Sequence, residues 1–255
     1  MDVGHALAGL RTVCVAEFGE AAGSRLAALA RPGFGILRGD DPSPTGRCAV
    51  GGPALLEPGT PWPEADGFPL SLLAVLDLEA LAPWLGEHRP SPAGLLNFFV
   101  VEPGPGQPYP EVDFDDPRWL RVVPADPARA VEVAAPVGTV SFGREPLHAE
   151  PVLTMPDEWS AAVQDIDFGL HPLDAATKVA AFYESGGLVT NPPRCAAFGW
   201  PVGELGSIHR WEDSHVHLLK LLDGPSACPT LYFMIPEAAF RSGDFSQAIV
   251  TLETY

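Results

Sequence analysis

The pattern of apolar and polar positions divides this chain into short strand-like runs and a few helical segments. Leu70 to Leu78 is continuously apolar, which is typical of a strand buried on both faces, and residues 95–101 form a second run of this kind. Residues 14–30 instead carry apolar side chains at intervals of three and four, which predicts a helix with one apolar stripe. A second clear helix is predicted from Asp174 to Ser185, ahead of a Gly-Gly pair.

Shorter elements fill much of the remaining chain. Strands are predicted at residues 120–123, 130–134, 152–156, 218–223, 231–235 and 249–255. Short helices are predicted at residues 78–85, from Glu158 with Asp157 as its cap, and from Pro236 to Ser242. Residues 39–67 and 102–118 are rich in Gly and Pro or in acidic residues, and we expect them to form long loops.

Two parts of the chain carry the same succession of runs. The segment from Leu72 to Asp77 is echoed 146 residues later by Leu218 to Asp223. The run that begins at Leu96 is echoed 135 residues later by the run that begins at Leu231. Similar runs in the same order with different spacing are expected of a duplicated unit whose loops have diverged. The predicted fold class is therefore α+β: an internally duplicated, sheet-rich, pseudo-twofold domain with few helices and long Pro/Gly-rich loops.

The repeat also sets the expected domain organisation. A chain of 255 residues lies at the upper end of single-domain size, so we expect one domain over residues 1–255. Its parts are an N-terminal helix at 14–30, a first unit at 48–101, a connecting region at 102–194 with a helix near 174–185, and a second unit at 195–255. The two units could form one continuous sheet or two facing sheets.

The net charge of the chain limits the classes of molecule that it could bind. The chain has 15 Lys and Arg against 33 Asp and Glu, a net charge of −18, and no cluster of basic residues. Nucleic acids and anionic membranes are therefore disfavoured as partners, because both are bound through basic side chains. A basic protein partner would fit this charge, although an acidic surface is also an ordinary means of staying soluble.

The cysteines and the N-terminus suggest a cytoplasmic protein. Four cysteines are scattered without metal-binding spacing, and the first residues lack the basic region of a signal peptide. No apolar run approaches the length of a membrane span. We expect reduced thiols and no resident cofactor, and the oligomeric state is left open.

A histidine-rich segment is the densest group of chemically capable residues. His215 and His217 alternate, so on a strand both imidazoles face the same side. His209, or an acidic residue at 212 or 213, could supply a third ligand for a divalent metal such as zinc. Alternatively, these polar residues simply crowd the solvent end of a buried strand.

Two carboxylates and three tryptophans are further candidates. Asp77 and Asp223 end the equivalent strands of the two units and could act as an acid–base pair or cap the turns that follow. Trp62 and Trp200 belong to the Gly/Pro-rich turns of the two units and could wall a shared groove. Trp211, within the histidine-rich segment, is the third candidate binding residue.

The ordered motifs resemble those of the YwqG-like family of bacterial proteins of unknown function. The resemblance rests on Gly51-Gly52-Pro53, Trp62-Pro63, the strand from Leu73 to Leu78 and, in the closing part, the segments from 218 to 246. It covers residues 48–101 and 195–255, and the middle only loosely. Family members tend to carry a glutamine in both strands where this chain has Val75 and Leu221. The resemblance implies a fold but carries no activity.

These observations favour a non-catalytic binding or interaction protein. An immunity-like role, in which the acidic surface meets a basic protein, is one form of that hypothesis. The alternative is a metal-dependent hydrolase or another enzyme built around His209, His215 and His217. No hydrolase, phosphate-loop or dinucleotide motif is present to decide between them.

Overall fold

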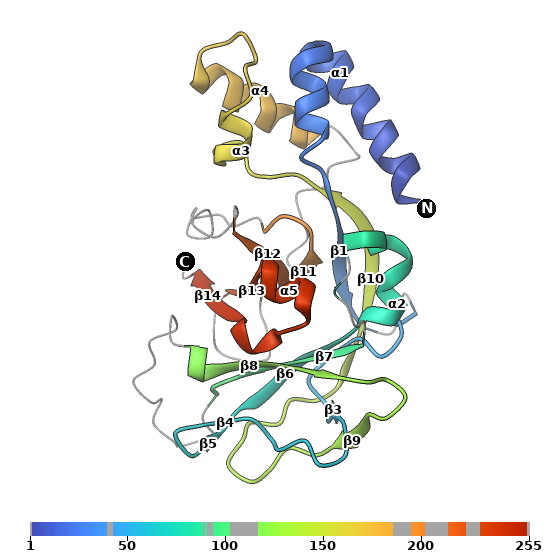
Figure 1. Cartoon of the computed structure of the whole chain (residues 1–255), viewed down its shortest axis with the longest axis vertical. Coiled ribbons are helices and arrows are strands. Elements are labelled where there is room, and N and C mark those ends of the chain that lie inside the picture. Colours follow the sequence, from blue (N-terminus) through green and yellow to red (C-terminus); the bar gives the residue numbers. More distant parts are fainter. Residues whose placement is uncertain are drawn as a thin grey trace.

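A bent antiparallel sheet of ten strands forms the body of the molecule (Figure 1). The computed structural model describes residues 2–39, 43–88, 90, 94–102, 117–185, 195–201, 214–222 and 230–253. The strand order is β14-β13-β12-β11-β1-β10-β2-β6-β7-β8. These strands are β1 (Arg31–Arg38), β2 (Ala49–Val50), β6 (Ser71–Asp77), β7 (Leu95–Val100), β8 (Leu120–Ala125), β10 (Glu145–Thr154), β11 (Ala196–Phe198), β12 (His215–Leu222), β13 (Thr230–Pro236) and β14 (Ile249–Glu253).

The described part of the chain also contains two small sheets and eight helical segments. The small sheets pair β3 (Ala54–Leu56) with β9 (Val131–Val133), and β4 (Glu64–Ala65) with β5 (Phe68–Pro69). The helices are α1 (Val3–Ala27), α2 (Leu78–Leu85), α3 (Ala161–Gln164), α4 (Pro172–Ser185) and α5 (Glu237–Ser242), with 3-10 turns η1 (Gly86–His88), η2 (Pro117–Trp119) and η4 (Phe245–Gln247). The fold is thus sheet-rich α+β, as predicted. Among the described helices, none is long and apolar enough to cross a membrane.

The long central strand β1 was not predicted from the sequence. It pairs with β10 from Arg31 to Arg38 and with β11 on its other edge. Pro32, Gly33 and Gly35 break the apolar pattern, although five of its eight positions are buried. Glycine is needed where the sheet is tight, because a Cβ at Gly33 would lie 3.0 Å from the carbonyl oxygen of Phe198. Pairing on both edges, rather than local propensity, makes this segment a strand.

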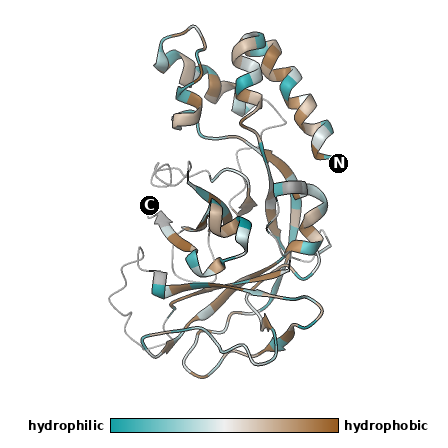
Figure 2. Cartoon of the chain, viewed as in Figure 1, coloured by the Kyte–Doolittle hydropathy of each residue, from teal (hydrophilic) through white to brown (hydrophobic). Residues whose placement is uncertain are grey.

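On either side of β1 and β10, four strands follow one another in chain order. They are β2-β6-β7-β8 on one side and β11-β12-β13-β14 on the other. The sheet bends until its two halves face each other: the ring of Phe98 on β7 lies 5.1 Å from that of Phe233 on β13, and η4 contacts β8. The apolar faces enclosed by this bend form the main core (Figure 2). The two units therefore share one sheet, while the duplication itself stays a prediction.

A second, smaller core lies under β3 and β9. It includes Leu56, Leu70, Phe99 and Trp119. Asn97 of β7 is fully buried there; its amide donates to the carbonyl oxygen of Leu55 (2.8 Å) and accepts from the Leu55 N–H (2.8 Å). One asparagine thus supplies both hydrogen bonds that a neighbouring strand would have made.

Helices α1, α3 and α4 form a cap at one end of the sheet (Figure 1). The predicted helix at 14–30 was wrong in its limits, because α1 runs from Val3 to Ala27 and is interrupted at Gly19 (φ 80°, ψ 167°). The ring of Phe18 packs edge-on against Phe168 and Phe182, at 5.3 and 5.2 Å. The cap prediction before α3 was also wrong: Ser160, not Asp157, is the cap of that helix, and its side chain accepts from the Val163 N–H.

Candidate functional site

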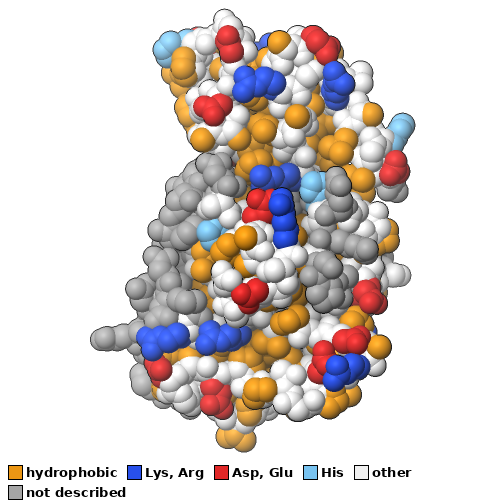
Figure 3. All heavy atoms as spheres, in the orientation of Figure 1, with side chains coloured by type: hydrophobic (Ala, Val, Ile, Leu, Met, Phe, Trp, Pro, Cys, Tyr) orange, Lys and Arg blue, Asp and Glu red, His pale blue; other side chains and the backbone are white. Residues whose placement is uncertain are grey.

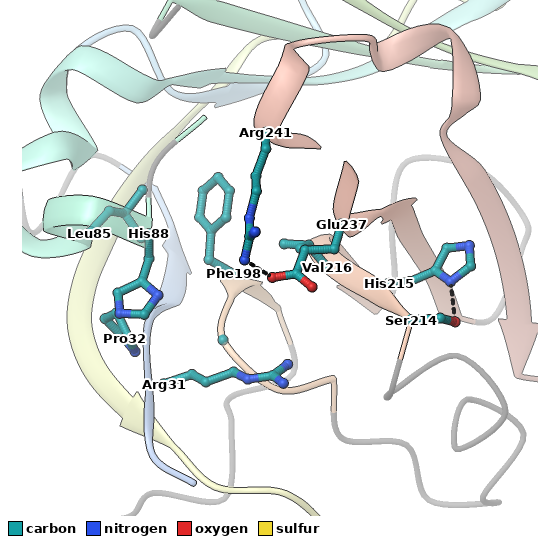
Figure 4. A pocket seen from close by; sticks show the side chains of 11 residues that line it. Arg31, Pro32, Leu85, His88, Phe198, Ser214, His215, Val216, Glu237 and Arg241 are labelled. Atoms are coloured by element: carbon teal, nitrogen blue, oxygen red, sulfur yellow. Dashed lines mark hydrogen bonds and ion pairs between the residues drawn. The ribbon is translucent and has the colours of Figure 1, made fainter. Parts of the chain in front are cut away.

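A pocket opens where the helical cap meets the sheet, between β1, β11, β12, α2 and α5 (Figure 4). Its volume is about 260 Å³. It combines basic, acidic and apolar side chains contributed by segments far apart in the sequence. The lining residues are Arg31, Pro32, Leu85, His88, Phe198, Gly199, Ser214, His215, Val216, Glu237 and Arg241. We call this the Arg31 pocket.

Trp200 lies beside the Arg31 pocket and is held by hydrogen bonds to neighbouring segments. Its backbone N–H donates to Thr154 Oγ1 (2.8 Å), and its indole N–H donates to the carbonyl oxygen of Leu29 (2.6 Å). The Thr154 hydroxyl in turn donates to the carbonyl oxygen of Arg31 (3.1 Å). The indole is 4% exposed. These bonds tie the start of β1 to the end of β11, so the pocket wall is set by backbone contacts.

The two arginines of the pocket are held in different ways. The guanidinium of Arg31 lies 3.5 Å from the centre of the Trp200 ring, a cation–π contact that orients its plane. Arg241 extends from α5 and donates to Oε1 of Glu237, one helical turn earlier. Figure 4 shows the Glu237 carboxylate projecting between the ends of the two arginine side chains.

The backbone at the end of β11 is strained. Phe198 (φ 59°) and Gly199 (φ 73°) are consecutive residues in the left-handed region, which a bulky side chain rarely adopts. A Cβ at position 199 would lie 2.2 Å from Thr154 Oγ1, so only glycine fits there. The Phe198 carbonyl accepts a hydrogen bond from Nδ1 of His217 at 3.1 Å. Strain of this kind is often found at ligand-binding sites.

His215 and His217 both lie on β12, as the sequence predicted, but in unlike surroundings. His217 is 1% exposed; because its Nδ1 donates to a carbonyl, Nε2 carries the lone pair, and Nε2 has no hydrogen-bond partner. Burial, with a smaller contribution from the charge of Lys220, lowers the pKa of His217 to about 4. His215 is half-buried, its Nδ1 lies 2.8 Å from the Ser214 hydroxyl, and burial lowers its pKa.

The predicted metal site stays a prediction. His209 lies outside the described residues. Within the described part of the chain, His, Cys, Asp and Glu form no group of three that could hold an ion. The Nδ1–H bond of His217 to a carbonyl is nevertheless the arrangement that orients a ligating imidazole through Nε2.

Asp77 makes the contacts of a helix cap. Oδ1 accepts from the Ala80 N–H (3.3 Å) at the start of α2, and Oδ2 accepts from the Arg47 N–H (3.1 Å). Both carboxylate oxygens are therefore engaged by the backbone, which is the structural alternative considered from the sequence. The acid–base role stays a prediction, because Asp223, the proposed partner, lies outside the described residues.

The candidate tryptophans occupy separate environments. Trp62 packs edge-on against Phe99 at 5.1 Å in the smaller core and donates its indole N–H to Leu70. Trp200 instead supports Arg31 beside the pocket. Trp211 lies outside the described residues. The described contacts thus join Trp200, but not Trp62, to the pocket.

Sequence reasoning missed the charged residues of the Arg31 pocket. Arg31 had been considered only as part of a helix stop, and Glu237 and Arg241 only as parts of a short helix. The spacing of the last two, four residues apart on one helix, was the only local signal. Nothing in the sequence indicates that residue 31 lies beside residues 237 and 241.

Comparison with known proteins places the similarity in the first half of the sheet. Residues 48–170, slightly less than half of the chain, match the model of a family described as Domain of unknown function (DUF1963). No curated protein matches the chain. The matched segment includes the first predicted unit but not residues 195–255. Of the pocket residues it contains only Leu85 and His88, so this similarity assigns no role to the pocket.

Proposed function

We propose that this chain is a non-catalytic binding protein whose site is the Arg31 pocket and whose ligand is a small molecule carrying a carboxylate. The observation that carries the proposal is the presence of two guanidinium groups, from Arg31 and Arg241, in the lining of one pocket. Guanidinium groups bind carboxylates through paired N–H donors. In a chain with 15 Lys and Arg against 33 Asp and Glu, two arginines in the lining of one pocket are a local concentration of basic residues.

The geometry leaves Arg241 able to take up a ligand. Its side chain is 75% exposed, and that of Glu237 is 56% exposed. An ion pair this open contributes about 1 kcal/mol or less, so a ligand carboxylate can share the guanidinium at little cost. Figure 3 shows basic and acidic side chains together where the cap meets the sheet. A pocket of about 260 Å³ suits a compact ligand, because the pockets that bind drug-sized molecules have volumes of roughly 300–1,000 Å³.

The first experiment measures binding of small mono- and dicarboxylates by calorimetry and by the ligand-induced rise in melting temperature. We expect Arg241→Gln to weaken binding by at least about tenfold, as for the loss of one charge-assisted hydrogen bond. Arg11→Gln is the matched control, because Arg11 also forms an exposed pair, with Glu20 at 2.9 Å on α1. Carboxylate binding that survives Arg241→Gln, or no carboxylate binding at all, would contradict the proposal.

A basic protein partner, including the immunity-like role, is a separate proposal supported by the net charge of −18. Its test is capture of partners from the native host at low and moderate salt. A single basic partner that is released as salt rises would support it. Absence of any partner at both salt concentrations would count against it.

A second candidate function is hydrolytic. It is favoured by the contact between the Ser214 hydroxyl and His215 and by the unpaired Nε2 of His217, since a hydroxyl beside an imidazole is a possible nucleophile and base. In Figure 4, however, the His215 ring points away from the two arginines. Measured metal content and esterase activity should both fall in His217→Ala if this function is present. Unchanged values would exclude it.

A further inference from the structure

The Arg31 pocket carries a negative charge in addition to its two positive charges. Glu237 uses Oε1 to accept from Arg241, while Oε2 has no hydrogen-bond partner among the described residues. Figure 4 shows this second oxygen pointing away from Arg241. A carboxylate in this position would repel a ligand that is only anionic. It would attract a ligand that carries a cationic group close to its own carboxylate.

We propose that the ligand of the Arg31 pocket is an α-amino acid. Its carboxylate would lie against the guanidinium groups of Arg31 and Arg241, and its ammonium group against Oε2 of Glu237. This inference rests on the proposed function, because it names the chemical class that the same site accepts. An α-amino acid fits the lining because its ammonium and carboxylate groups are bonded to the same carbon atom, and the opposite charges of Arg241 and Glu237 lie together one helical turn apart on α5.

The rest of the lining suits the remainder of such a molecule. Leu85, Phe198 and Val216 give the pocket an apolar side, against which the methylene groups of an amino acid can pack. The pocket volume of about 260 Å³ admits one compact molecule rather than a peptide. Trp200 and Thr154 hold the Arg31 side of the pocket through backbone hydrogen bonds, so this side needs little ordering when a ligand binds.

The test compares L-glutamate with glutarate, which has the same two carboxylates but lacks the ammonium group. Calorimetry on the full chain should show glutamate binding about tenfold more tightly, as for one added charge-assisted hydrogen bond. Glu237→Gln should bring the two affinities to within about twofold, since it removes the charge that recognises the ammonium. Glu20→Gln on α1, the partner of the exposed Arg11 pair, should leave the preference unchanged.

The outcomes separate this inference from the function on which it rests. If both ligands bind equally, and binding depends on Arg241, carboxylate binding stands and the amino-acid assignment is wrong. If neither ligand nor any other carboxylate binds, the proposed function fails as well. Melting curves and circular dichroism of each variant establish that it is folded. A preference for glutamate that persists in Glu237→Gln would also overturn the assignment, because the ammonium group would then be recognised elsewhere.

Discussion

At the scale of single residues, buried polar side chains in this molecule satisfy distant backbone groups. Trp84 donates its indole N–H to Val152 and Trp200 donates to Leu29, so each aromatic ring packs in a core while its polar atom joins two segments. In His217 only one of the two ring nitrogens makes such a hydrogen bond: Nδ1 donates to Phe198, whereas Nε2 has no hydrogen-bond partner. The protein therefore requires His217 to be neutral.

The first prediction concerns the pH dependence of stability. The pKa of His217 is about 4 in the folded chain, against an ordinary value of 6.5. Below pH 6.5 the unfolded chain takes up a proton that the folded chain does not, so the free energy of unfolding falls as the pH falls toward 4. The total loss is on the order of 3 kcal/mol. Above pH 6.5 this residue contributes no pH dependence.

Urea unfolding at pH 7, 5 and 4 measures this effect. His217→Asn is the informative variant, because an asparagine amide can donate to Phe198 from nearly the same place but does not titrate. We expect its stability to depend less steeply on pH than that of the unsubstituted chain. Equal slopes for the two proteins between pH 4 and 6.5 would show that His217 is not held neutral.

The second prediction concerns the strained end of β11. Gly199→Ala places an alanine in the left-handed region and also brings its Cβ against the Thr154 side chain. Gly169 is the control, because it has a similar φ (66°) but open space around its Cβ position. Gly169→Ala should cost roughly 1–2 kcal/mol from backbone strain alone, and Gly199→Ala at least twice as much. Chemical denaturation of both variants gives the comparison. Equal losses would mean that the Thr154 contact relaxes freely.

At the scale of elements, glycine has opposite effects on stability at two positions of helix α1. In α1, Gly9 is exposed with no heavy atom within 4 Å of its Cβ position, while a Cβ at Gly23 would lie 2.4 Å from the carbonyl oxygen of Cys14. Gly23 allows the second arm of α1 to approach the first after the break at Gly19. Helical propensity alone does not distinguish Gly9 from Gly23.

The third prediction uses this contrast. Gly9→Ala should raise the free energy of unfolding by about 0.5–1 kcal/mol, because alanine is the better helix former. Gly23→Ala should lower it by several times that amount, since backbone atoms of Cys14 and Val15 stand in the way. Thermal unfolding monitored at 222 nm (the helix band) tests both variants. Stabilisation by Gly23→Ala would show that the two arms of α1 are not closely packed.

At the scale of the whole molecule, the bend of the sheet brings the two predicted units face to face. Phe98 and Phe233, whose rings meet across the core, are separated by the same 135 residues as the starts of the two echoed runs, Leu96 and Leu231. Equivalent positions of the two units thus contact each other. This is the arrangement that a pseudo-twofold relation between them would give.

The fourth prediction tests the closure of the sheet. A double-mutant cycle with Phe98→Leu and Phe233→Leu should give a coupling energy of about 0.5–1.5 kcal/mol, the range for edge-on aromatic pairs. Phe18 and Phe98 belong to different parts of the core and serve as the control pair, for which additive effects are expected. Additivity for Phe98 and Phe233 would mean that β7 and β13 do not pack against each other in solution.

Local pattern was sufficient for elements whose burial is continuous or periodic. The strands β6, β7 and β13 and the helices α2 and α4 lie where the apolar runs predicted them, within one or two residues. In these segments the side chains that are buried are also the ones that define the run, so sequence and packing agree. The limits of α1 and the cap of α3 were missed because Gly19 and Ser160 act through backbone geometry that the apolar pattern does not record.

The sequence by itself therefore determined the sheet-rich class of the fold, the net charge of −18 and the apolar strands β6, β7 and β13. Only the tertiary structure decided that β1 lies at the centre of the sheet and that Arg31 shares a pocket with Glu237 and Arg241. The physical reason is that apolar periodicity reports which face of an element is buried, whereas convergence of charged residues depends on strand pairing. That pairing is set by contacts between segments more than a hundred residues apart, which no local pattern encodes.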